Sequence, residues 1–534
     1  MKNSLVLALF VCAAFVGCSD DTPVLRNNSV KSDAGGMPDS SHSPDTTGQT
    51  NNVVFPDDDA GQPDQGACSP DREDEPDPDF FDANCDGLDG DKSQSVFVAT
   101  YGDDANPGTK GLPKASVAAA VTTAAAEGKS WVLVAESFYD GSVELADGVS
   151  IAGGYGFGWK RDGRAKTTFR MGSPVISGTD IQQRTVLMGF EVLGGSAPPG
   201  MTAAAVYLQA SPGVVLMDLR ITGGKGGDGA RGEVGITGSN GNTGVKGGDA
   251  PPDSGTLGFC KNQDNPPSPG NGGEPSCGSD DGRGAKGGNG GFDGSSGTKG
   301  ANGTAGAIGG AGGTPGTPGL AGSNGSSGNT GVPGAGGQTE GSFIDGQWEG
   351  MDGGAGEAGT EGEGGAGGGG GGGGKSGGLN ICSSWGGAGG GGGSGGCGGD
   401  GGGGGQAGGA SVGVLLLNSD VEIIDCTIIG GLGGRGGDGG DGGDGGMGGA
   451  GGAGGDLEEN SGTGAKGGIG GRGGRGGQGG GGAGGPSIGL FSSGPLSKAP
   501  QASMVMQGEG GTGGAAGGAA GRGADGIAEA VRMP

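Results

Sequence analysis

The sequence predicts an all-β solenoid, a stack of short β-rich units that is interrupted by glycine-rich insertions. Residues 203–224 and 410–431 align without a gap at an offset of 207 (410 minus 203), and both end on Gly-Gly. A third copy, residues 186–195, falls on residues 215–224 at an offset of 29. A β-rich unit that recurs roughly every thirty residues is typical of one coil of a solenoid.

The composition leaves room for only one modest core. Glycine accounts for 153 of the 534 residues, and 30% of the residues are hydrophobic. Because glycine cannot fill a core, the residues that can pack are confined to three stretches, 93–222, 410–431 and 487–507.

The N-terminus is typical of a secreted, lipid-anchored protein. Met1-Lys2-Asn3 precedes the apolar run SLVLALFVCAAFVG, which is too short to span a membrane as a helix. Phe15-Val-Gly-Cys18 resembles a bacterial lipobox, and this resemblance implies cleavage after residues 1–17 and lipidation of Cys18. Ser19 favours transfer to the outer membrane, so we expect a cell-surface protein that is attached to the membrane by its lipid. The alternative is an ordinary secretory signal with a spare cysteine.

An acidic tether should follow the anchor over residues 18–76. Residues 19–92 carry 19 Asp and Glu against four Lys and Arg, so this part of the chain repels itself and cannot collapse. The net charge of -29 also argues against nucleic acid or anionic lipid headgroups as partners.

Residues 77–92 contain a calcium-loop-like motif. Carboxylate and carboxamide ligands alternate before Gly87, an arrangement that suits a hard cation, but the match to an EF-hand loop is incomplete. The motif looks more like the short calcium loops of thrombospondin type 3 repeats, and the alternative is the acidic end of the tether. The candidate ligands are Asp82, Asn84, Asp86, Asp89 and Asp91.

Seven cysteines remain beyond Cys12 and Cys18 in a chain bound for an oxidising compartment. Cys426 lies inside a predicted strand, one position past Asp425, and is expected to be a free thiol. Proximity in the sequence suggests three local disulfides: Cys68 with Cys85, Cys260 with Cys277, and Cys382 with Cys397.

A family resemblance appears at residues 79–224. The strand at Val96, the turn GDDANPGT, the alanine-rich stretch KASVAAAVTTAAAEGK and WVLVAESFYDGSVELADGVSIAGGY are similar to the opening of pectin-lyase-like proteins. The preceding DPDFFDANCDGLDGD looks like a stretch found in surface lipoproteins of the myxobacterial type. The resemblance implies a right-handed parallel β-helix, with the alanine-rich helix capping its N-terminal end. On this reading residues 93–224 and 410–431 are coils, and residues 486–534 hold the last strands and a glycine-rich tail.

The insertions, residues 225–409 and 432–485, have a three-residue period. Three residues per turn is the polyproline II repeat, so extended glycine-rich helices could pack closely through their bare faces. A disordered spacer is the alternative. Against disorder, folding the second insertion back on its turn would place Asp456 opposite Lys466 and Asp444 near Arg475. The arrays also resemble those of mycobacterial PGRS surface proteins, although the N-terminal domain of those proteins is missing.

Little catalytic chemistry is available. The only histidine, His42, lies in the tether, which excludes histidine-dependent triads and metal sites from the folded part. A calcium-dependent polysaccharide lyase could use Asp218, Arg220 and the aligned Asp425. Trp348 and Trp385 leave room for a polysaccharide-binding or adhesion module. We favour a non-enzymatic surface structural protein, because its mass is small-residue repeat and its chemistry is sparse.

Overall fold

The computed structural model describes most of the chain after the tether, all within one compact unit, Thr50–Pro534. Among these residues no helix has the length and apolar character needed to cross a membrane. Three short 3-10 helices are present: η1 (Lys92–Gln94), η2 (Phe157–Trp159) and η3 (Thr304–Gly306). The described residues are 53–54, 68–252, 264–278, 280–375, 382–516 and 521–533.

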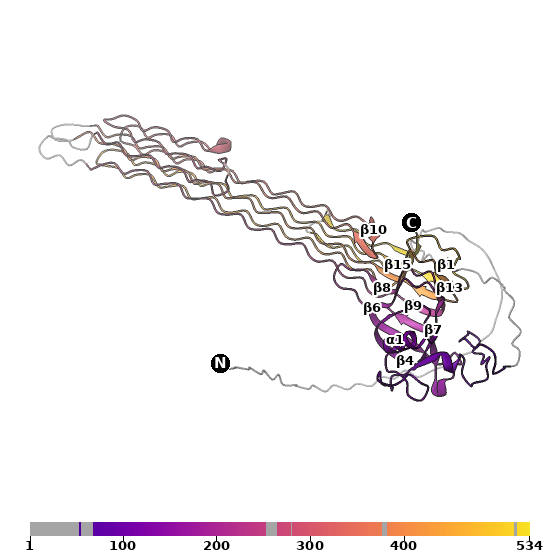
Figure 1. The fold of residues 1–534 in the computed structure, drawn as a ribbon. Coiled ribbons are helices and arrows are strands. Elements are labelled where there is room, and N and C mark those ends of the chain that lie inside the picture. Colours follow the sequence, from indigo (N-terminus) through magenta and orange to yellow (C-terminus); the bar gives the residue numbers. More distant parts are fainter. Residues whose placement is uncertain are drawn as a thin grey trace, which may run out of the picture. The chain divides into compact units, whose positions relative to one another are not determined.

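Most strands run parallel and form two columns, in which neighbouring strands come from successive repeat units (Figure 1). The first column ends where β16 pairs antiparallel with β1 (Val53–Val54). Its parallel members are β2 (Ser95–Val98), β3 (Trp131–Ala135), β5 (Ser150–Tyr155), β7 (Thr185–Leu193), β9 (Val214–Thr222), β13 (Glu422–Ile424) beside β14 (Thr427–Ile429), and β16 (Met504–Met506).

The second column is joined to the first because its long strand β6 also pairs with β7. All of its ladders are parallel, so each connection must leave the end of one strand and return to the start of the next. Its members are β4 (Ser137–Glu144), β6 (Thr167–Thr179), β8 (Ala203–Gln209), β12 (Ser411–Leu417), β15 (Ser487–Ser492) and β17 (Ala528–Arg532).

Residues that align between repeats in the sequence lie opposite each other in paired strands. Leu216 lies opposite Ile423, which confirms the alignment at 207, and Val186 lies opposite Val215, which confirms the one at 29. Equivalent residues therefore stack across repeat units: Leu187, Leu216 and Ile423 are all buried in the main core. Each such side chain contributes roughly 1.5–3 kcal/mol by leaving water.

The alanine-rich stretch forms the predicted helix, α1 (Val117–Glu127). The Ser116 hydroxyl accepts the Ala119 N–H at its start, and Gly128 adopts φ 66° at its end. One face buries Val117 and Val121 in the core that β2, β3 and β4 share. The helix thus packs on the first strands of both columns.

The glycine-rich insertions are ordered. The first leaves after β9 and the second after β14, and they run side by side in the same direction, away from the labelled strands (Figure 1). The N–H of Gly226 donates to the carbonyl of Leu432, that of Gly229 to Arg435, and the ladder continues at every third residue to Ala250 and Asp456. The strand register thus continues without a break into the insertions. Their hydrogen bonds recur every three residues, which is the repeat of a polyproline II helix.

Two segments, 364–374 and 386–396, form the interior of this glycine bundle and are buried throughout. Within the described chain each is hydrogen-bonded to six neighbouring segments, and each is one of the other's neighbours. Segment 386–396 also bonds segments near 238–250, 270–273, 282–291, 446–456 and 462–471. Segment 364–374 also bonds segments near 282–291, 295–303, 309–316, 317–326 and 462–471.

The glycine content of each chain follows the number of faces that neighbours cover. Residues 229–244, at the surface, have one glycine per triplet and two exposed side chains. Residues 433–455 have two buried glycines and one largely exposed residue per triplet. In the interior, a Cβ at Gly390, Gly391 or Gly392 would overlap a backbone carbonyl of a different neighbouring chain in each case.

Surface side chains complete the backbone hydrogen bonds of the adjacent chain. Asp228 accepts the N–H of Arg435, and Asn240 accepts that of Met447, both 207 residues further on. The predicted approach of Asp444 to Arg475 is confirmed at 3.7 Å. The predicted pairing of Asp456 with Lys466 was wrong, because Asp456 instead pairs with Lys246 of the first insertion at 3.4 Å.

We expect Gly392→Ala to destabilise the protein, because the new methyl group would meet the carbonyl of Gly365 between two packed backbones. Overpacking of this kind costs about 1–3 kcal/mol. Gly111→Ala is the matched control, since a Cβ there meets no atom within 4 Å. Urea denaturation of both variants measures the difference, and equal midpoints would contradict the packing described.

Candidate functional site

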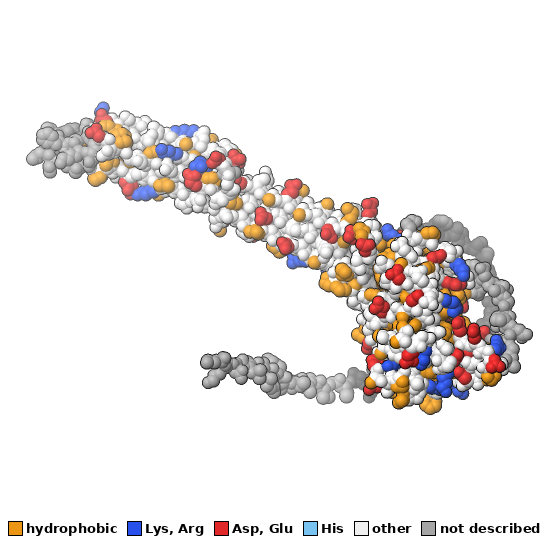
Figure 2. Space-filling model, viewed as in Figure 1, with side chains coloured by type: hydrophobic (Ala, Val, Ile, Leu, Met, Phe, Trp, Pro, Cys, Tyr) orange, Lys and Arg blue, Asp and Glu red, His pale blue; other side chains and the backbone are white. Residues whose placement is uncertain are grey.

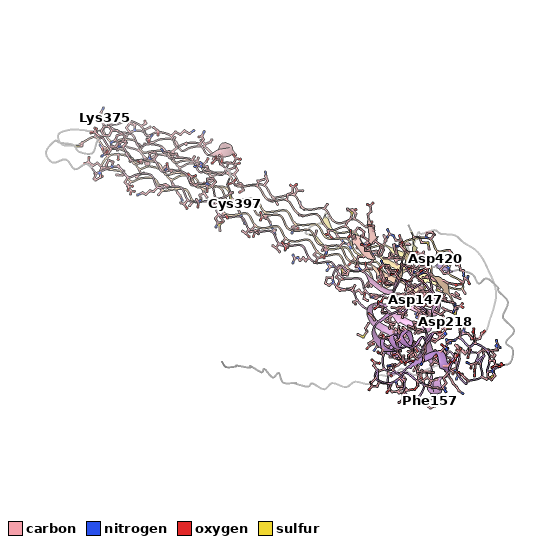
Figure 3. The ribbon with its side chains drawn as sticks, viewed as in Figure 1. Asp147, Phe157, Asp218, Lys375, Cys397 and Asp420 are labelled. Carbon is pink, nitrogen blue, oxygen red and sulfur yellow. A yellow bond between two sulfur atoms is a disulfide. The ribbon has the colours of Figure 1, made fainter. Side chains whose placement is uncertain are left out.

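A cleft of about 380 Å³ opens on the outside of the first column, where four stretches of chain meet. It contains acidic and basic side chains and lies beside the labelled Asp218 (Figure 3). Three of its residues, Asp218, Arg220 and Asp425, are the candidate lyase residues predicted from the sequence, and the structure brings them together. The lining residues are Ala165, Lys166, Thr167, Gly189, Phe190, Glu191, Asp218, Leu219, Arg220, Asp425 and Thr427.

Backbone bends place the two aspartates in this cleft. Gly189, Asp218 and Asp425 occupy equivalent positions in successive repeat units, with φ values of 71°, 48° and 50°. Glycine adopts this left-handed conformation freely, and aspartate tolerates it better than most side chains do. The aspartates that align at offset 207 are therefore bend residues, and stacking of the units aligns their carboxylates.

Among the charged side chains of the cleft, Arg220 and Glu191 form an ion pair. Burial raises the pKa of Asp218, and Asp425 adds to this effect, while Arg161 opposes it. Arg220 lies 3.3 Å from the carboxylate of Glu191, so its guanidinium is already engaged. A lyase base would have to be released from this ion pair or be supplied by Lys166.

The proposed calcium ligands do not form one shell. Asp82 accepts the N–H groups of Asp86 and Gly87, and Asn84 also accepts that of Asp86, so these three residues share one turn. Asp91 accepts the N–H of Ser93 as the cap of η1. Within the described residues, no group of three or more acidic, histidine or cysteine side chains is arranged to hold a metal ion. The arrangement does not fit the predicted calcium site.

Asp89, which was predicted to be a calcium ligand, instead pairs with the side chain of Arg161. Its carboxylate lies 2.6 Å from Arg161 Nη1, and the two side chains are 3% and 1% exposed. Burial raises the pKa of Asp89 to about 6, and the Arg161 guanidinium beside it opposes that rise. Arg161 also donates to the carbonyl of Asp77 and lies over the ring of Phe80. This buried pair fastens the acidic segment to the strands.

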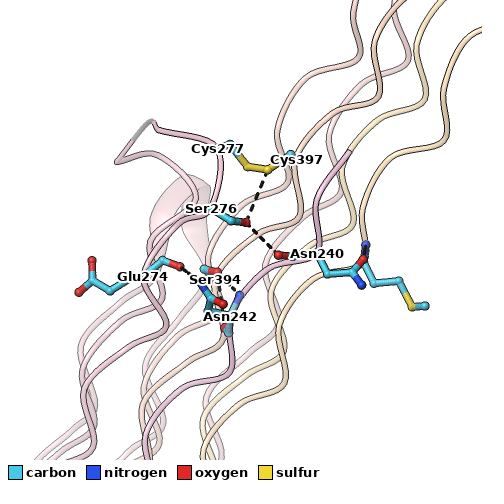
Figure 4. Close-up of a disulfide and its surroundings, with 8 residues drawn as sticks. Asn240, Asn242, Glu274, Ser276, Cys277, Ser394 and Cys397 are labelled. Atoms are coloured by element: carbon cyan, nitrogen blue, oxygen red, sulfur yellow. Dashed lines mark hydrogen bonds between the residues drawn. A yellow bond between two sulfur atoms is a disulfide. The ribbon is translucent and has the colours of Figure 1, made fainter. Parts of the chain in front are cut away.

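The disulfides differ in part from the pairs that proximity in the sequence predicts. Cys68 bonds Cys85, as predicted. Cys277, however, bonds Cys397, 120 residues away, because packing in the bundle brings the bend at Cys277 against the extended chain that carries Cys397 (Figure 4). Cys382 is also disulfide-bonded, and Cys260 lies outside the described residues.

The remaining cysteine, Cys426, is free and buried, as expected. Burial raises the pKa of its thiol to about 12, so it stays protonated at neutral pH. It is therefore a packing residue beside the cleft and is not poised as a nucleophile.

Trp348 is not available to a ligand. The hairpin of β10 (Gly341–Ile344) and β11 (Gln347–Gly350) lies on the outer face of the second column. Trp348 is 6% exposed there, and Arg532 lies 5.1 Å from its ring. The hairpin thus covers the face that a bound polysaccharide would otherwise reach. Trp385, in contrast, is half-buried against Phe292.

We expect Asp89→Ala to lower the free energy of unfolding by about 3–5 kcal/mol, because it leaves Arg161 buried without a counterion. Asp140→Ala is the control, since its ion pair with Arg170 is exposed and contributes at most about 1 kcal/mol. Thermal and urea unfolding report the difference. Similar losses in the two variants would show that the buried pair does not fasten the acidic segment.

The comparisons with known proteins assign the chain to no family. No family model matches the sequence. No curated protein matches it either. The chain is similar to a solved rhamnogalacturonan lyase at 15% identity and a TM-score of 0.18, which carries no argument about activity. This similarity covers 27% of this chain and 39% of that one, so the chain spans about two fifths of the lyase's length.

Proposed function

We propose that this protein is a non-enzymatic structural lipoprotein of the cell surface, which holds a stiff glycine bundle outside the membrane. The observation that supports this proposal best is the pair of buried segments, 364–374 and 386–396, each hydrogen-bonded to six neighbours in the described chain. A flexible spacer needs no such interior. Chains joined at every third residue on every side can bend only by breaking many hydrogen bonds together.

The base of the bundle suits the same role. We infer that the two strand columns are coils of a right-handed parallel β-helix, because parallel strands from successive units stack in register. Each glycine insertion begins where a first-column strand ends and returns where a second-column strand starts. The coils would thus act as a rigid mount that sets the spacing of the bundle chains.

The membrane attachment is part of the proposal. Residues 1–52 lie outside the described residues, so the signal peptide, the lipid on Cys18 and this part of the acidic tether rest on the sequence. Within the range predicted for the tether, Val53–Val54 pair with β16 and Cys68 is bonded to Cys85. The resemblance to a lipobox supports an anchor in the outer membrane, and the tether would then separate the folded part from the lipid surface. Figure 2 is consistent with a passive surface, since acidic, basic and apolar side chains are scattered over the visible face of the bundle.

A polysaccharide lyase is a second candidate, which one observation favours. Asp218 and Asp425 line the same cleft as Arg220, and the pKa of Asp218 is raised. Against it, Arg220 is paired with Glu191 and the predicted calcium ligands form no shell.

We expect the full chain to be found in the outer-membrane fraction, and Cys18→Ala to be released from it, with Ser29→Ala in the tether as the control. We also expect the protein to leave polygalacturonate and rhamnogalacturonan uncut, with calcium or with chelator, because Arg220, the candidate base, is paired with Glu191. Retention of Cys18→Ala in the membrane would contradict the lipid anchor. Cleavage that is lost in Asp218→Asn would contradict the structural role and establish the lyase.

A further inference from the structure

A second cleft, of about 390 Å³, lies among the first strands at the end opposite the glycine bundle, beside the labelled Phe157 (Figure 3). Four of its eight lining residues are aromatic, in a chain with an aromatic content of only 4%. A volume of this size is in the range of small-ligand sites. The lining residues are Tyr101, Ala135, Glu136, Tyr155, Gly156, Phe157, Gly158 and Trp159.

Two of the four rings form the floor and two stand in solvent. Tyr155 and Trp159 are 0% and 6% exposed, and both belong to a cluster that contains Phe97. Tyr101 is 74% exposed and Phe157 is 100% exposed. An apolar ring that gives up all contact with the core gains nothing for folding, so the position of Phe157 calls for another explanation.

The backbone next to Phe157 is strained, and this strained turn holds the Phe157 ring in solvent. Gly158 adopts φ 73°, and Trp159 follows it at φ 64°, a left-handed conformation that is strained for a bulky side chain. The edge-to-face contact of the Trp159 ring with Phe97, with centroids 4.7 Å apart, stabilises this turn from within. The N–H of Gly156 donates to the carbonyl of Lys160 and closes the turn. The exposed ring is thus carried on a fixed support.

One carboxylate also lines this cleft, that of Glu136, which directly follows β3. The backbone N–H of Glu136 donates to the carbonyl of Tyr155, which fixes this residue to the next strand. Glu136 is the only acidic residue among those that line the cleft. Hydrolysis of a glycosidic bond needs two carboxylates, so this arrangement can bind a sugar without cutting it.

We propose that this cleft binds a neutral oligosaccharide, with Tyr101 and Phe157 stacking on the apolar faces of sugar rings and Glu136 accepting hydrogen bonds from hydroxyl groups. Aromatic rings supply large contact areas at low conformational cost, and a few polar groups fix the orientation of the ligand. Glu136 and the net charge of -29 disfavour uronic acids, and they also disfavour an anionic membrane surface. The proposal does not depend on the structural role of the glycine bundle.

The test measures binding of cellohexaose, xylohexaose and mannohexaose to the full chain in detergent by calorimetry. We expect at least one of them to bind, and Phe157→Ala and Tyr101→Ala to weaken its binding at least tenfold. Phe138→Ala is the matched control, since Phe138 is 59% exposed but does not line this cleft, and it should bind as the wild type does. Because the Phe157 ring makes no buried contact, its removal should leave the melting temperature unchanged.

Three results would overturn the proposal. The first is that none of the three hexamers binds. The second is that Phe157→Ala and Tyr101→Ala bind as tightly as Phe138→Ala. The third is that hexagalacturonate or phosphatidylglycerol vesicles bind at this cleft, as judged by loss in Phe157→Ala, while the neutral hexamers do not.

Discussion

Close approach of backbone to backbone is the constraint on which the rest of the structure depends. Extended chains that exchange N–H···O=C bonds with neighbours on every side leave no room for a Cβ. Segments 364–374 and 386–396 have such neighbours, and nearly every residue in them is glycine; Ala366, Ala388 and Ser394 are the only exceptions. Glycine loses more conformational entropy on ordering than any other residue. The dense hydrogen-bond network must offset that loss, together with the strand columns from which the chains emerge.

The strand columns supply the hydrophobic packing that glycine cannot provide. Their stacked Leu, Ile and Val side chains form the hydrophobic core, and their parallel register sets where each glycine chain starts. The ladder that joins β9 to β14 becomes, without a change of partner, the ladder that joins Gly226 to Leu432. The Cys277–Cys397 disulfide and the side chains that cap neighbouring N–H groups add local links further along the bundle. Core and bundle are therefore one hydrogen-bonded system.

Repetition made part of this structure predictable. Because stacked units must match residue for residue, the offset of 207 gave the strand register, the side-by-side insertions and the alignment of Asp218 with Asp425. Contacts between non-equivalent segments leave no such pattern. Cys277 bonds Cys397 because the bundle packs together chains that no repeat relates. The ion pair of Asp456 with Lys246, in contrast, joins the two aligned insertions and could have been read from the offset of 207. Asp89 looked like a metal ligand because nothing in its own segment reveals Arg161, which is 72 residues away. The aromatic cleft was missed for the same reason, although the unusual sequence Tyr-Gly-Phe-Gly-Trp at 155–159 was a signal that could have been read.

Amide hydrogen exchange over residues 386–396 tests the central claim most directly. If these residues are the interior of a hydrogen-bonded glycine bundle, their N–H groups should exchange as slowly as those of β12, and far more slowly than the amides of the tether. A matching loss of protection in Gly392→Ala would tie the slow exchange to the packing of backbones. Exchange at the rate of an unstructured peptide throughout residues 386–396 would contradict the bundle, and with it the structural role proposed for the protein.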